Sequence, residues 1–115
     1  MRTIEKVSVI SEQDKALLGE ATDIIRKSMP SARVLLYGSV AKGTQSSDSD
    51  YDLLVLTERP VSKDGRRAVE HGLLELELER EVVLSTMYYS ISEWDSSLLR
   101  VSPFHSEVER DAIIL

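Results

Sequence analysis

The sequence has no cysteine, only three prolines and five glycines, and a single tryptophan and phenylalanine among 115 residues. Without cysteine, disulfides, thiolate metal sites and cysteine nucleophiles are excluded, and a reducing compartment is permitted. The N-terminal stretch lacks an apolar leader segment, and no later run approaches the length of a membrane span. We therefore expect a cytoplasmic protein that has no membrane partner.

Basic residues are also fewer than acidic ones. Fourteen lysines and arginines stand against twenty acidic residues, which gives a net charge of -6. This balance argues against extensive nucleic-acid binding through phosphates, although a small basic patch around one nucleotide is compatible with it. The length suits one domain spanning residues 1–115 and leaves no room for a second, substrate-binding domain.

Two stretches have the apolar spacing of helices. Ser11 followed by Asp14 has the spacing of a helix start, and Pro30 predicts that this helix ends near residues 28–29. Residues 61–81 are predicted to form a second helix, with Ala68, Val69, Leu73 and Leu76 on one face. The leucines at 74, 76 and 78 alternate with glutamates, a pattern that also suits a strand with one wet face, but length and the lack of a turn signal favour the helix.

Three shorter runs, Arg33–Tyr37, Tyr51–Leu56 and Val82–Tyr89, are rich in branched and aromatic residues and are predicted strands. Further along, Ser92 with Asp95, and Ser102 before Pro103, have the spacing of helix starts. The order of elements predicts a single α/β domain, with a small mixed sheet of three to four strands, parallel neighbours joined through helices, and helices packed on one face.

The first candidate site lies where the run at residues 33–37 stops. Gly38 permits backbone angles that other residues resist, and Ser39 adds a hydroxyl beside exposed N–H groups, so this pair can bind an anion. A Gly-Ser pair after a strand is also a common simple turn. The segment is not a P-loop, because Lys42 precedes the second glycine instead of following it.

Two carboxylates form the second candidate site. Side chains alternate along a strand, so Asp50 and Asp52 project to the same side and can offer oxygens to one hard cation or a pair of cations. The alternative is a solvated strand start, in which Asp48 and Asp50 make Asx-type hydrogen bonds within the turn.

Gly38-Ser39, ten intervening residues and then Asp50-Tyr51-Asp52 before an apolar run resemble the signature of the minimal nucleotidyltransferases of the DNA polymerase β superfamily. Lys42 and Gly43 also stand where that family often has a basic residue and a glycine. The resemblance spans most of the chain, with the Gly-Ser and Asp-x-Asp motifs as its specific part.

The resemblance implies transfer of a nucleoside monophosphate, with AMP the first expectation, from a nucleoside triphosphate to an acceptor hydroxyl, releasing pyrophosphate. It implies that Gly38, Ser39 and Lys42 bind the β and γ phosphates. It also implies that Asp50 and Asp52 are the catalytic residues and bind Mg2+ (or Mn2+).

The chain departs from the family at one place. Active members commonly carry a third acid in the third strand, and Val83 aligns with it. Glu81 and Ser85 share the strand face of Val83 by alternation, so Glu81 is a possible substitute metal ligand. The departure weakens the expectation of catalysis more than that of nucleotide and metal binding.

Three functions therefore stay open. The first is a nucleotidyltransferase. The second, implied by the resemblance, is an antitoxin or regulatory subunit that binds an all-helical HEPN-type partner, with weak or lost catalysis. The third is a degenerate domain with a structural role only. Because no second domain covers the site, we also expect either a homodimer or a hetero-complex with such a helical protein.

Overall fold

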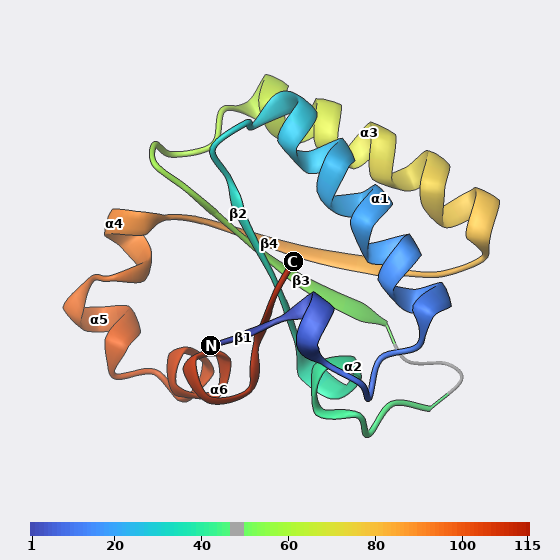
Figure 1. Ribbon diagram of the computed structural model, residues 1–115. Coiled ribbons are helices and arrows are strands. Elements are labelled where there is room, and N and C mark those ends of the chain that lie inside the picture. Colours follow the sequence, from blue (N-terminus) through green and yellow to red (C-terminus); the bar gives the residue numbers. More distant parts are fainter. Residues whose placement is uncertain (47–49) are drawn as a thin grey trace.

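The computed structural model describes residues 1–46 and 50–115, and their fold is α/β (Figure 1). The elements, in chain order, are β1 (Arg2–Thr3), the 3-10 helix η1 (Ile4–Lys6), α1 (Glu12–Ser28), β2 (Arg33–Tyr37), α2 (Gly38–Lys42), β3 (Tyr51–Thr57), α3 (Lys63–Arg80), β4 (Leu84–Ser90), α4 (Ile91–Trp94), α5 (Ser97–Arg100), α6 (Pro103–Asp111) and β5 (Ile113–Ile114).

The strands form one mixed sheet, as predicted, in the order β1-β5-β2-β3-β4. Strands β3 and β4 are parallel and joined through α3, as expected, whereas β2 and β3 are antiparallel neighbours. The short strands β1 and β5 are parallel as well, but they come from the two ends of the chain and are not joined through a single helix. The strand count is five instead of three to four. The two extra strands, β1 and β5, have two residues each; β5 pairs with β1 and also with Leu35 and Leu36 of β2.

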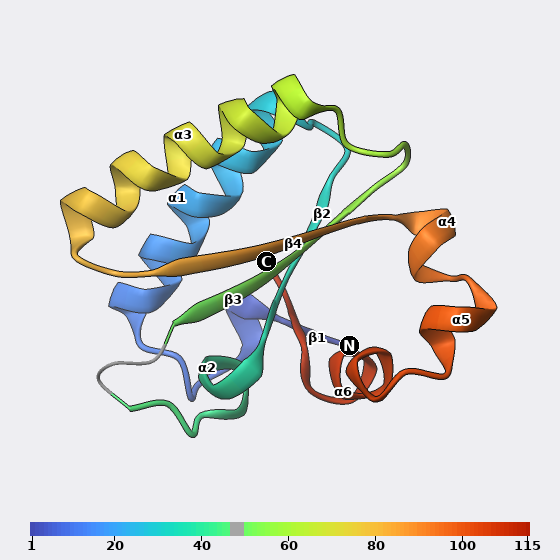
Figure 2. The ribbon, with the colours of Figure 1, turned by 180° about the vertical axis from the view of Figure 1, so that it is seen from behind.

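Helices cover both faces of the sheet. The two long helices, α1 and α3, lie side by side on one face, as Figures 1 and 2 show from opposite sides. Their core cluster with the sheet includes Leu18, Ile25, Leu36, Leu53, Val69 and Leu73. The short helices α4 and α6 pack on the opposite face, in a second cluster that includes Leu35, Leu54, Leu56, Trp94 and Val108.

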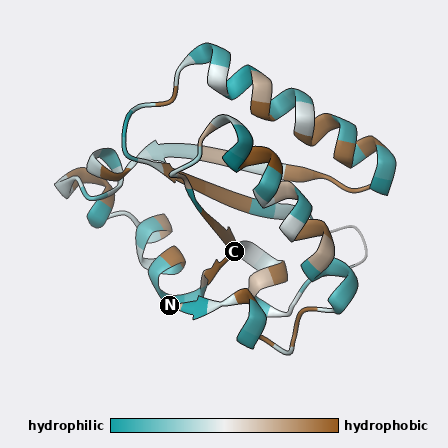
Figure 3. Cartoon of the chain, turned by 45° about the horizontal axis from the view of Figure 1, so that its top comes forward, coloured by the Kyte–Doolittle hydropathy of each residue, from teal (hydrophilic) through white to brown (hydrophobic). Residues whose placement is uncertain are grey.

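The prediction of helices on one face therefore holds for the long helices, and the short ones add a layer. The reason lies in β2 and β3, whose consecutive apolar residues alternate between faces and leave both faces in need of cover. Figure 3 shows this apolar character along the central strands, while the helices carry both apolar and polar residues.

Helix α3 confirms the helical interpretation of the leucine-glutamate stretch. Leu76 is buried with Val69 and Leu73, whereas Leu74 and Leu78 are 51% and 73% exposed, because helical spacing turns them away from the sheet. Ala68 is exposed, so its assignment to the buried face was wrong. Neither α3 nor any other helix within residues 1–46 and 50–115 is long and apolar enough to cross a membrane.

Serine caps fix the helix starts. Ser11 Oγ accepts a hydrogen bond from the Asp14 amide at 3.1 Å, and Ser102 Oγ accepts one from the His105 amide at 3.1 Å, both as predicted. The predicted start at Ser92 was wrong by two residues. Ser90 caps α4 instead, in a reciprocal capping box with Glu93, because β4 runs directly into that helix.

Candidate functional site

The turn after β2 brings the two predicted motifs into contact. Gly38 begins α2 with a φ of +77°, and a β-carbon built on it would lie 2.2 Å from Asp52 Oδ2. Any side chain at position 38 would therefore require both a left-handed backbone and displacement of that carboxylate. The glycine thus exposes bare backbone to the Asp52 carboxylate.

Strand pairing places Asp52 in the middle of a row that crosses the sheet. It lies opposite Tyr37 of β2 and in register with Ser85 of β4. Asp50 precedes β3, and its Oδ2 accepts a hydrogen bond from Ser85 Oγ at 3.3 Å. Both acids therefore face the same side of the sheet, as alternation predicts.

The acid pair is electrostatically unfavourable in the absence of a cation. Partial burial raises the pKa of Asp52, and the nearby Asp50 carboxylate raises this pKa further. Tyr37 responds to the same charge: burial raises the pKa of its phenol first, and the Asp52 carboxylate adds to that shift. Each observation places negative charge at the N-terminal start of β3, where a cation would relieve the repulsion.

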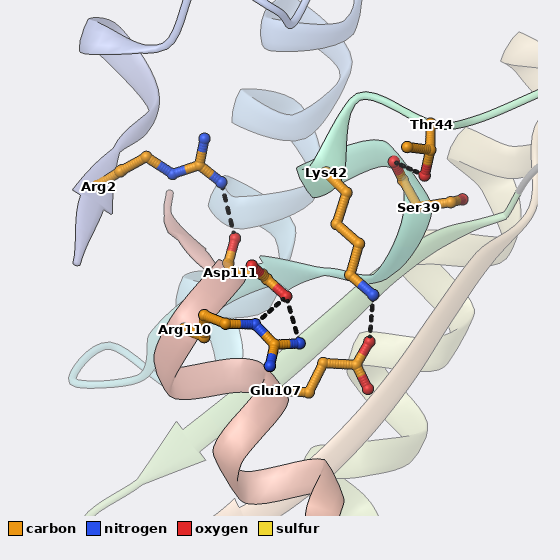
Figure 4. A network of polar contacts seen from close by, with 7 residues as sticks. All are labelled: Arg2, Ser39, Lys42, Thr44, Glu107, Arg110 and Asp111. Carbon is orange, nitrogen blue, oxygen red and sulfur yellow. Dashed lines mark hydrogen bonds and ion pairs between the residues drawn. The ribbon is translucent and has the colours of Figure 1, made fainter.

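Lys42 is held by the last helix. Its Nζ contacts Glu107 Oε1 of α6 at 2.6 Å (Figure 4), and both side chains are about one third exposed. The lysine was predicted to bind phosphates, and in the described structure its charge is balanced by a carboxylate. Sequence analysis missed Glu107, because it lies 65 residues away along the chain.

The segment around α2 is closed by backbone hydrogen bonds. The Ser39 carbonyl accepts from the Thr44 amide at 3.0 Å and from the Thr44 hydroxyl at 3.5 Å, the second contact being drawn in Figure 4. Arg2 Nη2 ties this segment to the end of α6, donating to the carbonyls of Ala41 at 3.1 Å and Asp111 at 2.8 Å. The segment that begins at Gly38-Ser39 is therefore held in place by hydrogen bonds at both of its ends.

Helix α1 also supports the acid pair. The Tyr51 hydroxyl donates to Asp14 Oδ1 at 2.8 Å, and burial together with this hydrogen bond raises the pKa of Tyr51 to about 12. Tyr51 lies between the two acids in sequence, so alternation points it to the opposite face of β3, toward α1. Asp48, the alternative turn residue, lies outside the described residues.

The prediction that Glu81 shares the strand face was wrong. Glu81 is the C-cap of α3, with a left-handed φ of 54°, and its amide donates to the carbonyl of Glu77. The strand begins at Leu84 instead of Val82, because the helix continues through Arg80. Glu81 is therefore not positioned by strand alternation to substitute for a third acid.

Val83 does lie beside the acid pair. Its carbonyl accepts a hydrogen bond from the Tyr51 amide at 3.0 Å, and the parallel register pairs Tyr51 with Leu84. One step earlier in this register, Val83 comes alongside Asp50. Its side chain is 51% exposed, so this position has room for other residues.

The donor set fits a magnesium ion bound together with a polyphosphate. Within the two described ranges, no group of three or more His, Asp or Glu residues is arranged to hold a metal. Mg2+ in nucleotide sites commonly takes one or two carboxylates and completes its shell with phosphate oxygens and water. Asp50 and Asp52 are two carboxylates of this kind, and Asp52 lies directly beside the Gly38 backbone.

Comparisons with known proteins identify a family and a similar fold. A family model described as "Nucleotidyltransferase domain" matches residues 18–111. The fold is similar to a solved structure described as "Crystal structure of the toxin-antitoxin with AMP-PNP", with a TM-score of 0.55 and 18% sequence identity, over 84% of this chain and 69% of that chain. The chain has no match among curated protein sequences.

Replacing Gly38 with alanine is expected to destabilise the protein. The left-handed backbone alone costs an alanine about 1–2 kcal/mol, and the contact with Asp52 adds to this. Urea unfolding measures the change. Gly19→Ala is the matched control: nothing lies within 4 Å of its β-carbon, so helix propensity should raise the free energy of unfolding by roughly 0.5–1 kcal/mol. Equal effects at both positions would contradict the close approach at Gly38.

Replacing Asp52 with asparagine is expected to stabilise the metal-free protein at pH 7. A raised pKa means that the folded state favours the protonated carboxyl; this contribution is present below the unfolded value of 3.8 and is lost as pH rises through the folded pKa. The variant removes the ionised group, so its advantage should shrink as pH falls toward 3.8. Urea unfolding in EDTA across this range measures it, with exposed Asp23→Asn as control. A constant or opposite difference would contradict the electrostatic argument.

Proposed function

This chain belongs to the nucleotidyltransferase domain family, and we propose that it transfers a nucleoside monophosphate from a nucleoside triphosphate to an acceptor hydroxyl, with release of pyrophosphate. The observation that carries the proposal is the close approach of the Gly38 backbone to the Asp52 carboxylate, which supports a phosphate site and a cation site next to each other. We propose that residues 1–115 act as one such unit, in the cytoplasm.

The triphosphate is proposed to bind along the Gly38-Ser39 turn. Amide groups and the Ser39 hydroxyl can donate to its β and γ oxygens, because a turn with a left-handed glycine exposes neighbouring N–H groups. Lys42 is within the same helix and carries the balancing charge. For this, Lys42 exchanges its exposed partner Glu107 for phosphate, an exchange of low cost since solvent-exposed ion pairs contribute about 0–1 kcal/mol.

Asp50 and Asp52 are proposed to hold Mg2+ or Mn2+. Such an ion supplies charge stabilisation at the attacking and leaving oxygens of an in-line displacement. The two carboxylates share a sheet face and would both be able to bind it; burial, and next the Asp50 carboxylate, raise the pKa of Asp52, and a cation would offset both effects. Adenine is the proposed base, supported by the structurally similar toxin-antitoxin, which was crystallised with AMP-PNP.

This chemistry lacks an evident base for the proton of the acceptor hydroxyl. A carboxylate at position 83 would lie beside Asp50 and could take that proton, but this chain has valine there. In the absence of that base, the proton passes to water or to the phosphate itself. We therefore propose a slow transferase.

A second function is favoured by the same valine together with the similar toxin-antitoxin structure. In this alternative, the chain is an antitoxin or regulatory subunit that binds nucleotide and a helical HEPN-type protein without turning the nucleotide over efficiently. Either a homodimer or this hetero-complex would cover the open side of the site. The two functions differ in whether label from the nucleotide becomes covalently attached to an acceptor.

The test of transfer is incubation with each of the four α-labelled ribonucleoside triphosphates, Mg2+ and lysate of the source cell, followed by separation of labelled protein and RNA. We expect label from ATP, lost in the Asp50→Asn, Asp52→Asn double variant. The control, Asp23→Asn with Asp64→Asn, removes the same charge from exposed helical positions and should keep full transfer. Nucleotide binding by calorimetry without any transfer would favour the regulatory alternative, and unchanged Mg2+-dependent binding in the site variant would refute both.

Restoring an acid at position 83 is expected to accelerate transfer. General-base assistance contributes typically 10²–10⁴-fold, so Val83→Asp should raise kcat by at least about 100-fold over wild type. The position is half exposed, so the new charge needs no burial. Val83→Asn has the same shape and no charge, and it should leave kcat near wild type. If both variants behave alike, residue 83 does not contact the reacting groups.

A further inference from the structure

One hydroxyl lies beside both acids of the site. Ser85 is the second residue of β4, and its backbone is in register with Asp52. Its Oγ donates to Asp50 Oδ2 at 3.3 Å. Among the hydrogen bonds of the described residues, this one joins the outer strand of the sheet directly to a proposed metal-binding carboxylate.

We propose that Ser85 is a positioning residue, which orients the Asp50 carboxylate so that the acid pair binds a divalent cation. This inference rests on the proposed function, because it takes Asp50 as a metal ligand. Two carboxylates on one face repel each other and rotate apart unless something holds them. A hydroxyl donor restrains one carboxylate and adds no negative charge, whereas an acid in its place would add to the repulsion.

The neighbouring residues make this role specific. Val83, two residues earlier, offers no side-chain donor, and Met87, two residues later, is apolar and 37% exposed. Along this face of β4, Ser85 is therefore the residue that can donate to Asp50. In metal sites, groups that hydrogen-bond a ligand commonly change metal affinity 10–100-fold when removed. The 3.3 Å distance is longer than an ideal O–H···O bond, so the effect belongs at the lower end of that range.

Strand β4 also provides a matched control on its other face. Thr86 Oγ1 donates to Glu70 Oε1 of α3 at 2.9 Å, which is again a bond from a hydroxyl to a carboxylate. Glu70 also accepts from the Tyr88 hydroxyl at 2.8 Å and lies against the sheet from the α3 side. Removing the Thr86 hydroxyl thus perturbs the same strand by the same chemistry, away from the acid pair.

The experiment measures Mn2+ binding by the intact chain, from the loss of the free-ion electron paramagnetic resonance signal, with no nucleotide present. Ser85→Ala should weaken Mn2+ binding about tenfold, Ser85→Thr should restore it to near wild type, and Thr86→Ala should leave it unchanged. Thermal unfolding in EDTA shows whether each variant is folded, and the Ser85 variants should melt close to wild type.

Mn2+ affinity that is equal in wild type and Ser85→Ala would overturn the positioning role while leaving the proposed function intact. An equal loss in Ser85→Ala and Thr86→Ala would overturn it too, because the effect would then belong to the strand and not to the hydroxyl. If wild type and Asp50→Asn bind Mn2+ alike, Asp50 is no ligand, and both this inference and the metal site of the proposed function fail.

Discussion

The site depends on one close approach: the backbone at Gly38 meets the carboxylate of Asp52 where no β-carbon fits. This approach follows from the antiparallel pairing of β2 with β3, which sets Tyr37 opposite Asp52. The next residue, Gly38, therefore lies beside the N-terminal start of β3. A single pairing register thus joins the two halves of the motif. A slip of one residue would send Asp52 to the α1 and α3 face and separate them.

The charges around that contact contribute little to stability. The acids repel, and Lys42 is paired with Glu107 at the protein surface. Neither arrangement contributes much to stability, because like charges cost free energy and exposed pairs contribute little. The rigid parts lie beneath, in the apolar rows of β2 and β3 and the Tyr51–Asp14 hydrogen bond. The molecule therefore combines a buried apolar sheet with charged side chains at its edge whose present contacts are partly exposed.

Sequence analysis predicted the local features best. The alternation of Asp50 and Asp52 and the caps at Ser11 and Ser102 each depend on residues within a few positions of one another. The short helix α2 (Gly38–Lys42) was missed, because the sequence analysis expected only a turn there. Contacts between distant segments were not predictable in this way: Glu107 reaches Lys42 only because α6 folds back over the opposite face, and β5 enters the sheet beside β2. The prediction for Glu81 failed for a different reason. Helix and strand patterns overlap near residue 81, and the point where the helix stops decided which one applied.

Positions 83 and 38 differ in how freely their side chains can be substituted. Val83 is half exposed beside Asp50, so packing in the fold does not require a particular side chain at this position. A single nucleotide change interconverts valine and aspartate codons, and an aspartate at this exposed position would leave the strand pairing of the sheet intact. Gly38 has no such freedom, because every alternative disturbs Asp52. Position 83 can thus be substituted without disturbing the contact between Gly38 and Asp52, whereas position 38 cannot.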